Sequence, residues 1–292
     1  MLTLDEKKIR KGKPIGLPYQ GSKKKISKKI VEIIKQNFGT DKPIYDVFGG
    51  GGAITAECMF NGLEVHYNDL DKDITDMFQM VISQDREWIK TLIVSRDDFF
   101  EIKNKDNKTV DDNLKLLVNS FGNNKNSYLY SAQWADMKYK LAVEIINKHD
   151  AFVGYKETDT YKNASRPYDE GKLKIHQALA QIERLQQLER LQQIEQLEST
   201  NLSYEAFSDI EDAIFYLDPP YENTTHETYK GDFNSQTFYD WAFEMSKKNI
   251  VLISSYEISD DRFRCVYEFK KARSTMQSGG AGKRTEKLFM AV

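Results

Sequence analysis

The sequence predicts an α/β protein with a mostly parallel sheet, interrupted by a mainly helical insertion. Across residues 44–69, a strand pattern, a glycine turn, a helix pattern and a second strand pattern follow one another. Such a βαβ unit implies parallel strands with helices on the faces of the sheet. A second region of this kind runs from about residue 212 to the C-terminus, and the residues between the two regions differ in composition.

The first region begins with a β-branched and aromatic run at residues 44–48, which four glycines close. Residues 53–59 carry a helix pattern, and the alternation of apolar and polar residues at 63–69 predicts the next strand. The glycine turn at 49–52 lets the backbone approach a ligand in front of a helix N-terminus. Because the turn lacks the GxGxxG spacing and no Gly-Lys-Ser/Thr follows, NAD and ATP are disfavoured as ligands.

The insertion is rich in Asn, Asp, Lys and Tyr, and we expect it to be mostly helical with polar loops. We place it at residues 75–173, between residues 1–74 and 174–292 of the other domain. Residues 173–197 favour a helix that returns the chain to the sheet. Its apolar residues recur every three positions and drift around a helix, which disfavours a coiled coil.

The second region completes the predicted sheet. Its apolar run at residues 214–217 is typical of a buried strand, and residues 237–248 favour a helix. A further strand is expected at 250–254, with closing strands at 265–269 and 287–292.

Composition narrows the class of protein. At 292 residues, with 40% hydrophobic and 30% charged residues, the chain fits a soluble globular protein of one large domain carrying an insert. No apolar run reaches the length of a membrane span, and the N-terminus lacks the apolar core of a secretory signal. The two cysteines and four histidines show no spacing typical of metal ligands. We therefore expect no metal and a cytoplasmic location.

Charge is distributed unevenly along the chain. The first 30 residues hold ten Lys/Arg against two acidic residues, a net charge of +8, so the remainder carries −11. A lysine-rich N-terminus is usually a solvated tail. Here it surrounds a turn-rich segment at residues 18–23, and a local basic patch is compatible with binding to a phosphate backbone. Lys11 and Lys13 are the candidates for this contact.

Asp218-Pro219-Pro220-Tyr221 follows the predicted strand 214–217, at the edge where open α/β sheets place their ligands. Proline lacks an N–H, so this stiff loop presents a carboxylate, a free carbonyl and a flat ring in one orientation. These groups suit a planar base with an exocyclic amino group. The alternative is that the prolines end a strand and Tyr221 packs in the core.

Asp69 ends the second predicted strand, about twenty residues after the glycines. An acid at this place can accept hydrogen bonds from the hydroxyls of a ribose. The alternative is a helix N-cap, because Asp69 and Asp71 precede a helix pattern.

Together these motifs form a recognisable set, in this order: Pro18-Tyr19-Gln20-Gly21-Ser22-Lys23, Asp46-Val47-Phe48-Gly49-Gly50-Gly51-Gly52, Asn68-Asp69-Leu70-Asp71, Asp218-Pro219-Pro220-Tyr221 and Lys283-Arg284-Thr285-Glu286-Lys287-Leu288. The set resembles the D12 (Dam-like) class of S-adenosylmethionine-dependent DNA adenine-N6 methyltransferases. The resemblance implies a class I methyltransferase fold, which is Rossmann-like with a mostly parallel seven-stranded sheet. It also implies a target-recognition domain inserted before the Asp-Pro-Pro-Tyr strand.

The resemblance further implies residue roles. The cofactor S-adenosylmethionine would be bound by Tyr19, Lys23, Asp46, Phe48, Gly49, Gly50, Gly51, Asp69, Tyr204 and Asp218. The Asp218 carboxylate and the Pro219 carbonyl would accept the two N6 hydrogens of adenine and leave its lone pair facing the methyl group. Tyr221 would stack on the base, which must leave the duplex to reach the site. Pro220 completes the catalytic tetrapeptide, and the chemistry needs no metal or covalent intermediate.

One departure concerns specificity. The Arg-Tyr-Asn and Phe-Asn stretch typical of GATC-specific members is absent, and a variant similar to phage and prophage relatives stands in its place. From that variant, Asn123, Asn124, Lys125 and Tyr128 are candidates for contacting DNA. The partner would be double-stranded DNA in a bacterial or phage-infected cell. The resemblance also allows a cognate restriction endonuclease, and we expect a monomer.

Three other functions stay open on the sequence. A cytosine-N4 DNA methyltransferase shares the chemistry, although Ser is commoner than Asp at the first position of its tetrapeptide. A non-catalytic DNA-binding relative would keep the fold, but an inactive protein has no chemical reason to keep the acid, prolines, aromatic residue and glycines together. An NAD-dependent oxidoreductase would require NAD to bind at the glycine turn.

Overall fold

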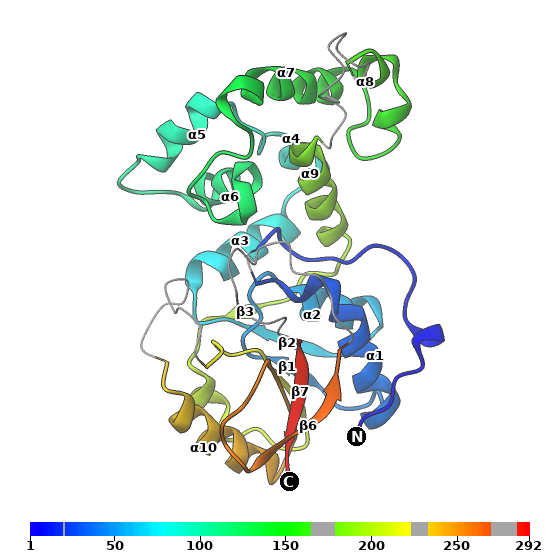
Figure 1. Ribbon diagram of the computed structural model, residues 1–292, viewed down its shortest axis with the longest axis vertical. Coiled ribbons are helices and arrows are strands. Elements are labelled where there is room, and N and C mark those ends of the chain that lie inside the picture. Colours follow the sequence, from blue (N-terminus) through cyan, green and yellow to red (C-terminus); the bar gives the residue numbers. More distant parts are fainter. Residues whose placement is uncertain (20, 165–178, 223–232, 270–284) are drawn as a thin grey trace. The chain divides into compact units, whose positions relative to one another are not determined.

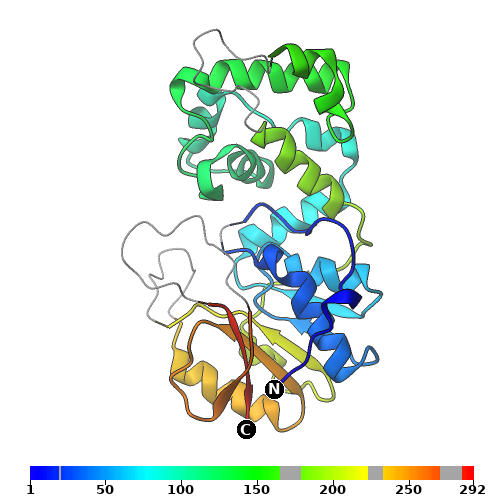
Figure 2. The same cartoon turned by 45° about the vertical axis from the view of Figure 1, so that its right-hand side comes forward.

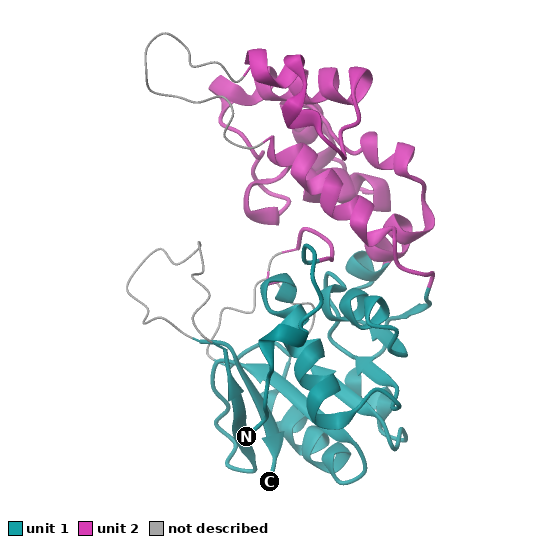
Figure 3. Ribbon diagram, turned by 90° about the vertical axis from the view of Figure 1, so that its right-hand side faces the viewer, with its two compact units in different colours: residues 1–14, 23–75, 197–292 teal, residues 15–22, 76–196 magenta. Residues whose placement is uncertain are grey.

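The computed structural model describes residues 1–19, 21–164, 179–222, 233–269 and 285–292 (Figure 1). The chain divides into two compact units (Figure 3). Unit 1 comprises residues 1–14, 23–75 and 197–292, and unit 2 comprises residues 15–22 and 76–196. Within the described ranges, no helix is long and apolar enough to cross a membrane.

Unit 1 contains a seven-stranded sheet with the strand order β3-β2-β1-β4-β5-β7-β6. Its strands are β1 (Ile44–Asp46), β2 (Val65–Asn68), β3 (Ser199–Thr200), β4 (Ile214–Leu217), β5 (Ile250–Ser255), β6 (Phe263–Glu268) and β7 (Lys287–Ala291). Strands β3, β2, β1, β4 and β5 pair in parallel, whereas β7 runs antiparallel to both β5 and β6. The mostly parallel seven-stranded sheet of a class I methyltransferase is therefore confirmed.

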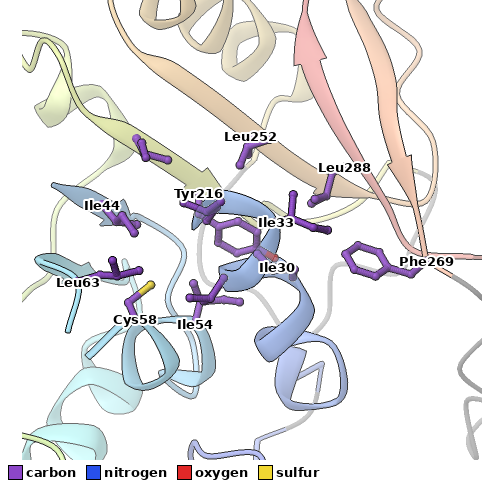
Figure 4. Packing of buried hydrophobic residues seen from close by; sticks show 13 residues of the cluster. Ile30, Ile33, Ile44, Ile54, Cys58, Leu63, Tyr216, Leu252, Phe269 and Leu288 are labelled. Carbon is purple, nitrogen blue, oxygen red and sulfur yellow. The ribbon is translucent and has the colours of Figure 1, made fainter. Parts of the chain in front are cut away.

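Helices cover both faces of this sheet. Successive strand residues point to opposite faces, so a strand that is apolar throughout has apolar side chains to bury on each face. On one face, Ile214 and Tyr216 of β4 pack with α1 (Ser27–Phe38) and α2 (Ala53–Phe60) in a continuous apolar core (Figure 4). On the other face, Phe215 and Leu217 pack against α10 (Ser235–Ser246). Figure 2 shows α10 and the pair α1 and α2 on opposite sides of the sheet. A strand buried on both faces explains why residues 214–217 are all apolar.

The N-terminal segment is held against this core by side-chain hydrogen bonds. The Asn37 amide oxygen accepts from the Thr3 backbone N–H at 3.0 Å. The Arg10 guanidinium donates to both carboxylate oxygens of Glu57 in α2 at 2.7 and 2.8 Å. The basic N-terminus is thus a packed part of unit 1, with Lys11 and Lys13 exposed on it.

Unit 2 is mainly helical in its described part. Its helices are the second part of α3 (Lys72–Ser83), then α4 (Arg86–Lys90), α5 (Arg96–Lys103), α6 (Val110–Asn119), α7 (Ala132–Lys148), α8 (Asp159–Ala164) and α9 (Ala180–Leu191). Short 3-10 turns lie at Phe121–Asn123 and Tyr155–Glu157. The boundary with unit 1 falls inside α3 and again after residue 196.

Helix α9 explains why unit 2 extends past residue 173. Its apolar residues at 182, 185, 188 and 191 all have zero exposure, although a spacing of three carries them around the helix. Helices α4 and α6 pack against α9, so more than one side of it is covered. The helix expected at 173–197 is observed from Ala180, and residues 173–178 lie outside the described part of the chain.

Candidate active site

Three acids of unit 1 gather at one edge of the sheet. Asp46 ends β1, Asp69 follows β2, and Asp218 follows β4. Because β2, β1 and β4 are parallel neighbours, their carboxyl ends meet at this edge. The charge of Asp218 raises the pKa of both Asp46 and Asp69, in addition to a larger effect of burial.

The glycine turn follows β1 directly. A Cβ atom at Gly49 would lie 2.3 Å from the Tyr67 ring, so only glycine fits there. Gly50 and Gly52 adopt φ angles of +49° and +68°, which side chains rarely tolerate. The Tyr67 hydroxyl donates to the Gly50 carbonyl at 2.7 Å. The turn is therefore held tightly against β2 and leads into the N-terminus of α2.

Asp69 supports this turn. One oxygen of its carboxylate accepts the Gly50 N–H at 2.8 Å, and the other accepts the Asp71 N–H at 2.8 Å. The second bond closes a turn before α3, and the first links Asp69 to the glycine turn. The capping role that the sequence left open falls to Asp71, whose carboxylate accepts the Asp73 N–H at 3.0 Å. Burial raises the pKa of Asp69 to about 6. The carboxylate can still accept hydrogen bonds from ligand hydroxyls, so its ribose role stays a prediction.

Asp46 is more deeply buried than a group that contacts a ligand usually is. It is 1% exposed, and one of its oxygens accepts the backbone N–H and the hydroxyl of Thr55 at 3.1 and 2.6 Å. Burial raises its pKa to about 7. In the structure, Asp46 fixes the first turn of α2 behind the glycines, which supports a ligand site indirectly.

Asp218 forms the centre of a polar cluster. The Lys23 ammonium lies 2.6 Å from one carboxylate oxygen, and the Tyr221 hydroxyl is 2.9 Å from the other. Pro219 and Pro220 are buried between them in the chain. Burial raises the pKa of Asp218, Lys23 opposes this shift, and the charge of Glu286 adds to it.

Glu286 is a member of this cluster to which the sequence assigned no role. Its carboxylate accepts from the hydroxyls of Tyr221 and Ser254, the latter at 2.7 Å. It also lies 3.8 Å from the Lys23 ammonium. The strand topology is the signal that locates Glu286. Because β7 runs antiparallel to β5, the residue before β7 lies at the edge where the parallel strands end. Lys283 and Arg284 of the same motif, and Gln20, lie outside the described residues.

An aromatic group lies beside the glycine turn in unit 1. Phe48 and Tyr204 face each other with ring centroids 6.2 Å apart and planes 29° apart. Tyr204 also contacts Trp241 of α10, with centroids at 5.0 Å. Both predicted cofactor contacts are thus brought together and remain partly exposed, as an aromatic wall against which a planar group can pack.

The remaining candidates belong to unit 2. Tyr19 lies in the segment grouped with that unit, and its contact with a cofactor stays a prediction. Asn123 and Lys125 adopt left-handed φ angles of +57° and +60° in a loop that a bridge between Ser120 and Tyr128 closes. The Asn124 amide oxygen accepts the N–H of residue 126 at 2.8 Å, so this side chain shapes the loop.

Tyr128 is placed in the core of unit 2 rather than on a surface. It is 6% exposed, and its hydroxyl donates to the Val94 carbonyl at 3.0 Å. Its ring packs against Phe99 at 5.4 Å. Tyr128 therefore supports the loop from beneath. Phe121 shows the opposite arrangement: it is 59% exposed, although it lies at the base of the same loop, next to Ser120.

Comparison with known proteins decides the family. The family model described as "D12 class N6 adenine-specific DNA methyltransferase" matches residues 19–273. The chain belongs to this family. It is an adenine-N6 DNA methyltransferase that uses S-adenosylmethionine. No curated protein matches the chain in sequence.

Among solved structures, the chain is similar to the rRNA methyltransferase AviRa from Streptomyces viridochromogenes, with a TM-score of 0.36 and 11% identity. The similarity covers 90% of this chain and 84% of that one. At this level neither the substrate nor the site residues can be transferred.

The site of this D12 methyltransferase fits S-adenosylmethionine chemically. The ligand is a cation with ribose hydroxyls, and the edge holds three carboxylates whose pKa values burial raises. A nearby cation stabilises the ionised form of such carboxylates, and the ribose hydroxyls can donate hydrogen bonds to Asp69. Gly49 lets the turn lie directly against the Tyr67 ring, where a Cβ atom would clash. Within the described residues, no group of three or more His, Cys, Asp or Glu could hold a metal ion.

Proposed function

We propose that the chain methylates N6 of an adenine that has left the DNA duplex, at the edge of the unit 1 sheet where Asp218 lies. The observation that carries this proposal is the position of Asp218: it follows β4, beside the glycine turn and within the cluster of Lys23 and Tyr221. S-adenosylmethionine supplies a methyl group on a positively charged sulfur. The residues of the chain must hold the base and orient its amino group toward this methyl group.

Asp218 and Pro219 orient the amino group in this proposal. Adenine N6 is a poor nucleophile because its lone pair is delocalised into the ring. Acceptance of its two hydrogens by the Asp218 carboxylate and the Pro219 carbonyl favours a pyramidal nitrogen with a directed lone pair. Proline has no N–H, so the loop offers that carbonyl few internal donors. The rate gain then comes from alignment and preorganised electrostatics.

Tyr221 would stack on the base. Its hydroxyl is anchored at Asp218 and Glu286, and its ring meets the edge of Tyr256 with centroids 4.8 Å apart. These contacts fix the plane of the ring before a base arrives. Stacking of a base on an aromatic side chain contributes about 1–3 kcal/mol, which offsets part of the cost of removing the base from the duplex.

We further propose that Lys23, Phe48, Gly49–Gly51, Asp69 and Tyr204 contact the cofactor. Lys23 and Asp69 supply hydrogen-bonding groups, and Phe48 and Tyr204 supply the aromatic wall. Asp46 acts through Thr55 and the turn. This arrangement is what supports the proposed binding mode.

Unit 2 would recognise the target sequence. Its loop at residues 120–128 combines an exposed Phe121 with Asn123 and Lys125 on a backbone that hydrogen bonds hold in one conformation. Asn can read base edges, Lys can contact phosphates, and an exposed ring can stack on a base. Since the loop lacks the stretch typical of GATC-specific members, a different target, as in phage and prophage relatives, is proposed.

We also propose a cellular setting. The partner is double-stranded DNA, and the enzyme would act as a monomer in the cytoplasm of a bacterium or a phage-infected cell. A cognate restriction endonuclease is a further partner that the family chemistry allows.

The test compares purified wild type with Asp218→Asn and a control, Asp209→Asn, which changes an exposed carboxylate of unit 1. We expect Asp218→Asn to lose methyl transfer to adenine by at least about 1000-fold, because a neutral amide accepts hydrogen bonds less strongly and can donate instead. Calorimetry should show S-adenosylmethionine still bound, and the control should keep full activity. Methylation by Asp218→Asn at the wild-type rate would remove the proposed role of the carboxylate.

A further inference from the structure

Glu286 joins four elements of unit 1 that are far apart in the chain. Its carboxylate accepts from the Tyr221 hydroxyl and from the Ser254 hydroxyl of β5, and it faces the Lys23 ammonium at 3.8 Å. Its side chain is 16% exposed, so these contacts lie largely away from water. An acid in such surroundings is held in one orientation by its hydrogen bonds.

Glu286 and Asp218 share the same donors. The Tyr221 hydroxyl lies within hydrogen-bonding distance of both carboxylates but has one proton to give. Lys23 lies 2.6 Å from Asp218 and 3.8 Å from Glu286, so its single positive charge also serves both. Every donor that moves to Glu286 leaves a lone pair of Asp218 open.

This sharing matters for the proposed reaction, on which the inference rests. Asp218 must accept a hydrogen from adenine N6, yet both of its oxygens have partners in the structure. A second carboxylate within reach of the same partners lets Tyr221 and Lys23 stay hydrogen-bonded when the amino group arrives. Without it, the substrate would have to compete with a buried ion pair.

We propose that Glu286 is a positioning residue that takes over the Tyr221 hydroxyl and the Lys23 ammonium, so that the Asp218 carboxylate is open to the amino group of the substrate. Glu286 touches neither substrate nor methyl group in this account. It acts through Tyr221 and Lys23.

The proposal is tested with Glu286→Gln, which keeps the size of the side chain and removes its charge. The matched control is Glu257→Gln, an exposed carboxylate paired with Lys287 of β7. We expect Glu286→Gln to lower kcat about 10- to 100-fold, with the KM for DNA and the affinity for S-adenosylmethionine within about threefold of wild type. The control should keep the wild-type kcat. An unchanged kcat in Glu286→Gln would overturn the proposal.

A double-mutant cycle with Tyr221→Phe locates the effect. If Glu286 acts through the Tyr221 hydroxyl, the double variant should lose little more activity than the more impaired single variant. Fully multiplied losses would show independent action and contradict this part of the proposal. Thermal unfolding of each variant separates a loss of folded protein from a loss of kcat.

A carboxyl 13C NMR titration of Asp218 gives a readout that needs no activity, with Asp218→Asn used for assignment. The charge of Glu286 raises the pKa of Asp218, so Glu286→Gln should lower it, whereas Glu257→Gln should not. Among the described residues, the other charged or titratable groups that act on Asp218 or are acted on by it include Lys23, Tyr221, Tyr216, Asp46 and Asp69.

An unmoved Asp218 pKa in Glu286→Gln would overturn the coupling between the two acids, even if the wild type proved inactive on adenine. An inactive wild type with the expected pKa change would instead contradict the proposed function and leave the Glu286–Asp218 coupling standing. The two failures are therefore distinguishable.

Discussion

Asp69 is the acid whose ionisation a ribose-bearing ligand would sense most directly. Burial raises its pKa to about 6, while hydrogen bonds from the N–H groups of Asp71 and Gly50 oppose the shift. The carboxylate is thus ionised at neutral pH but becomes neutral within reach of ordinary buffers. A ligand that donates hydrogen bonds to it favours the ionised form and should lower its pKa on binding.

The affinity for S-adenosylmethionine should therefore depend on pH. It should be constant above about pH 7 and weaken as pH falls through 6, approaching about tenfold for each pH unit, because the neutral carboxyl accepts hydrogen bonds poorly. Calorimetry between pH 5 and 8 measures this. Asp69→Asn should bind more weakly with a flatter profile, and an equally steep profile in Asp69→Asn would assign the titration to another group, Asp46 or Asp218.

Single residues differ in how well the sequence predicts them. Asp69 and Asp218 end apolar strand patterns, and the rule that ligands bind at the carboxyl ends of parallel strands places them. The role of Glu286 was not predicted, because its position depends on the antiparallel direction of β7, which no local sequence pattern encodes. Tyr128 was expected to contact DNA because its stretch stands where the GATC-specific members carry theirs, whereas its burial depends on Phe99 and Val94, far away in the sequence.

Among the elements, α9 anchors the start of the loop proposed to contact DNA. The Arg184 guanidinium of α9 donates to the carbonyls of Val118 and Ser120 at 2.6 and 2.7 Å, at the end of α6 where that loop begins. Burial lowers the pKa of Arg184 to about 10, so it is still charged at neutral pH. A charged donor thus satisfies carbonyls that the end of a helix leaves without partners.

Replacing Arg184 by Met should lower the free energy of unfolding by about 1–3 kcal/mol, because the carbonyls at the end of α6 lose their donor. DNA affinity should fall as well, since the loop after residue 119 loses an anchor. Denaturant unfolding and a DNA-binding titration measure the two effects. Arg190→Met is the control on the same helix: among the described residues, its buried Nε has no hydrogen-bond partner, so its loss should cost less. Equal losses in both variants would contradict the assigned role.

The strands show which elements a sequence specifies. β4 was expected at residues 214–217 and is observed there, because every residue of a strand buried on both faces must be apolar. β3 was not expected: it spans two residues, Ser199–Thr200, and two polar residues carry no periodicity. Helix α9 was expected from the sequence. Its burial on several sides depends on the helices that pack against it, and its own hydrophobic pattern does not specify it.

At the scale of the whole molecule, charge separates the N-terminal segment from the rest of the chain. Its net charge of +8 lies on residues 1–30, part of which hydrogen bonds hold to α1 and α2. The alternative of a solvated tail does not describe this segment. Lys11 and Lys13 are exposed on it and so present a fixed positive charge to the solvent.

If these lysines contact phosphates, Lys11→Ala combined with Lys13→Ala should weaken DNA binding equally for different sequences. The slope of log K against log salt concentration should become shallower by about 1.8, at about 0.9 for each phosphate that a lysine no longer neutralises. Fluorescence anisotropy at salt concentrations from about 50 to 200 mM gives this slope. Lys247→Ala with Lys248→Ala removes the same charge elsewhere, and an identical change in that control would show a general charge effect.

The whole-molecule organisation was only partly available from the sequence. The polar composition after residue 75 predicted an insertion, and the structure has a compact unit from residue 76. Its other end, at residue 196, depends on the packing of α9 against α4 and α6. That residues 15–22 group with the same unit follows from contacts distant in sequence, which composition cannot show.

The reaction proposed for the Asp218 site is methyl transfer to adenine N6 in DNA. It can be tested by single-molecule sequencing of genomic DNA from a methylation-free host that expresses the wild type or Asp218→Asn. We expect N6-methyladenine in one short sequence motif with the wild type and none with Asp218→Asn, at equal levels of folded protein. Unmodified adenine in the wild-type host, or modification by both proteins, would contradict it.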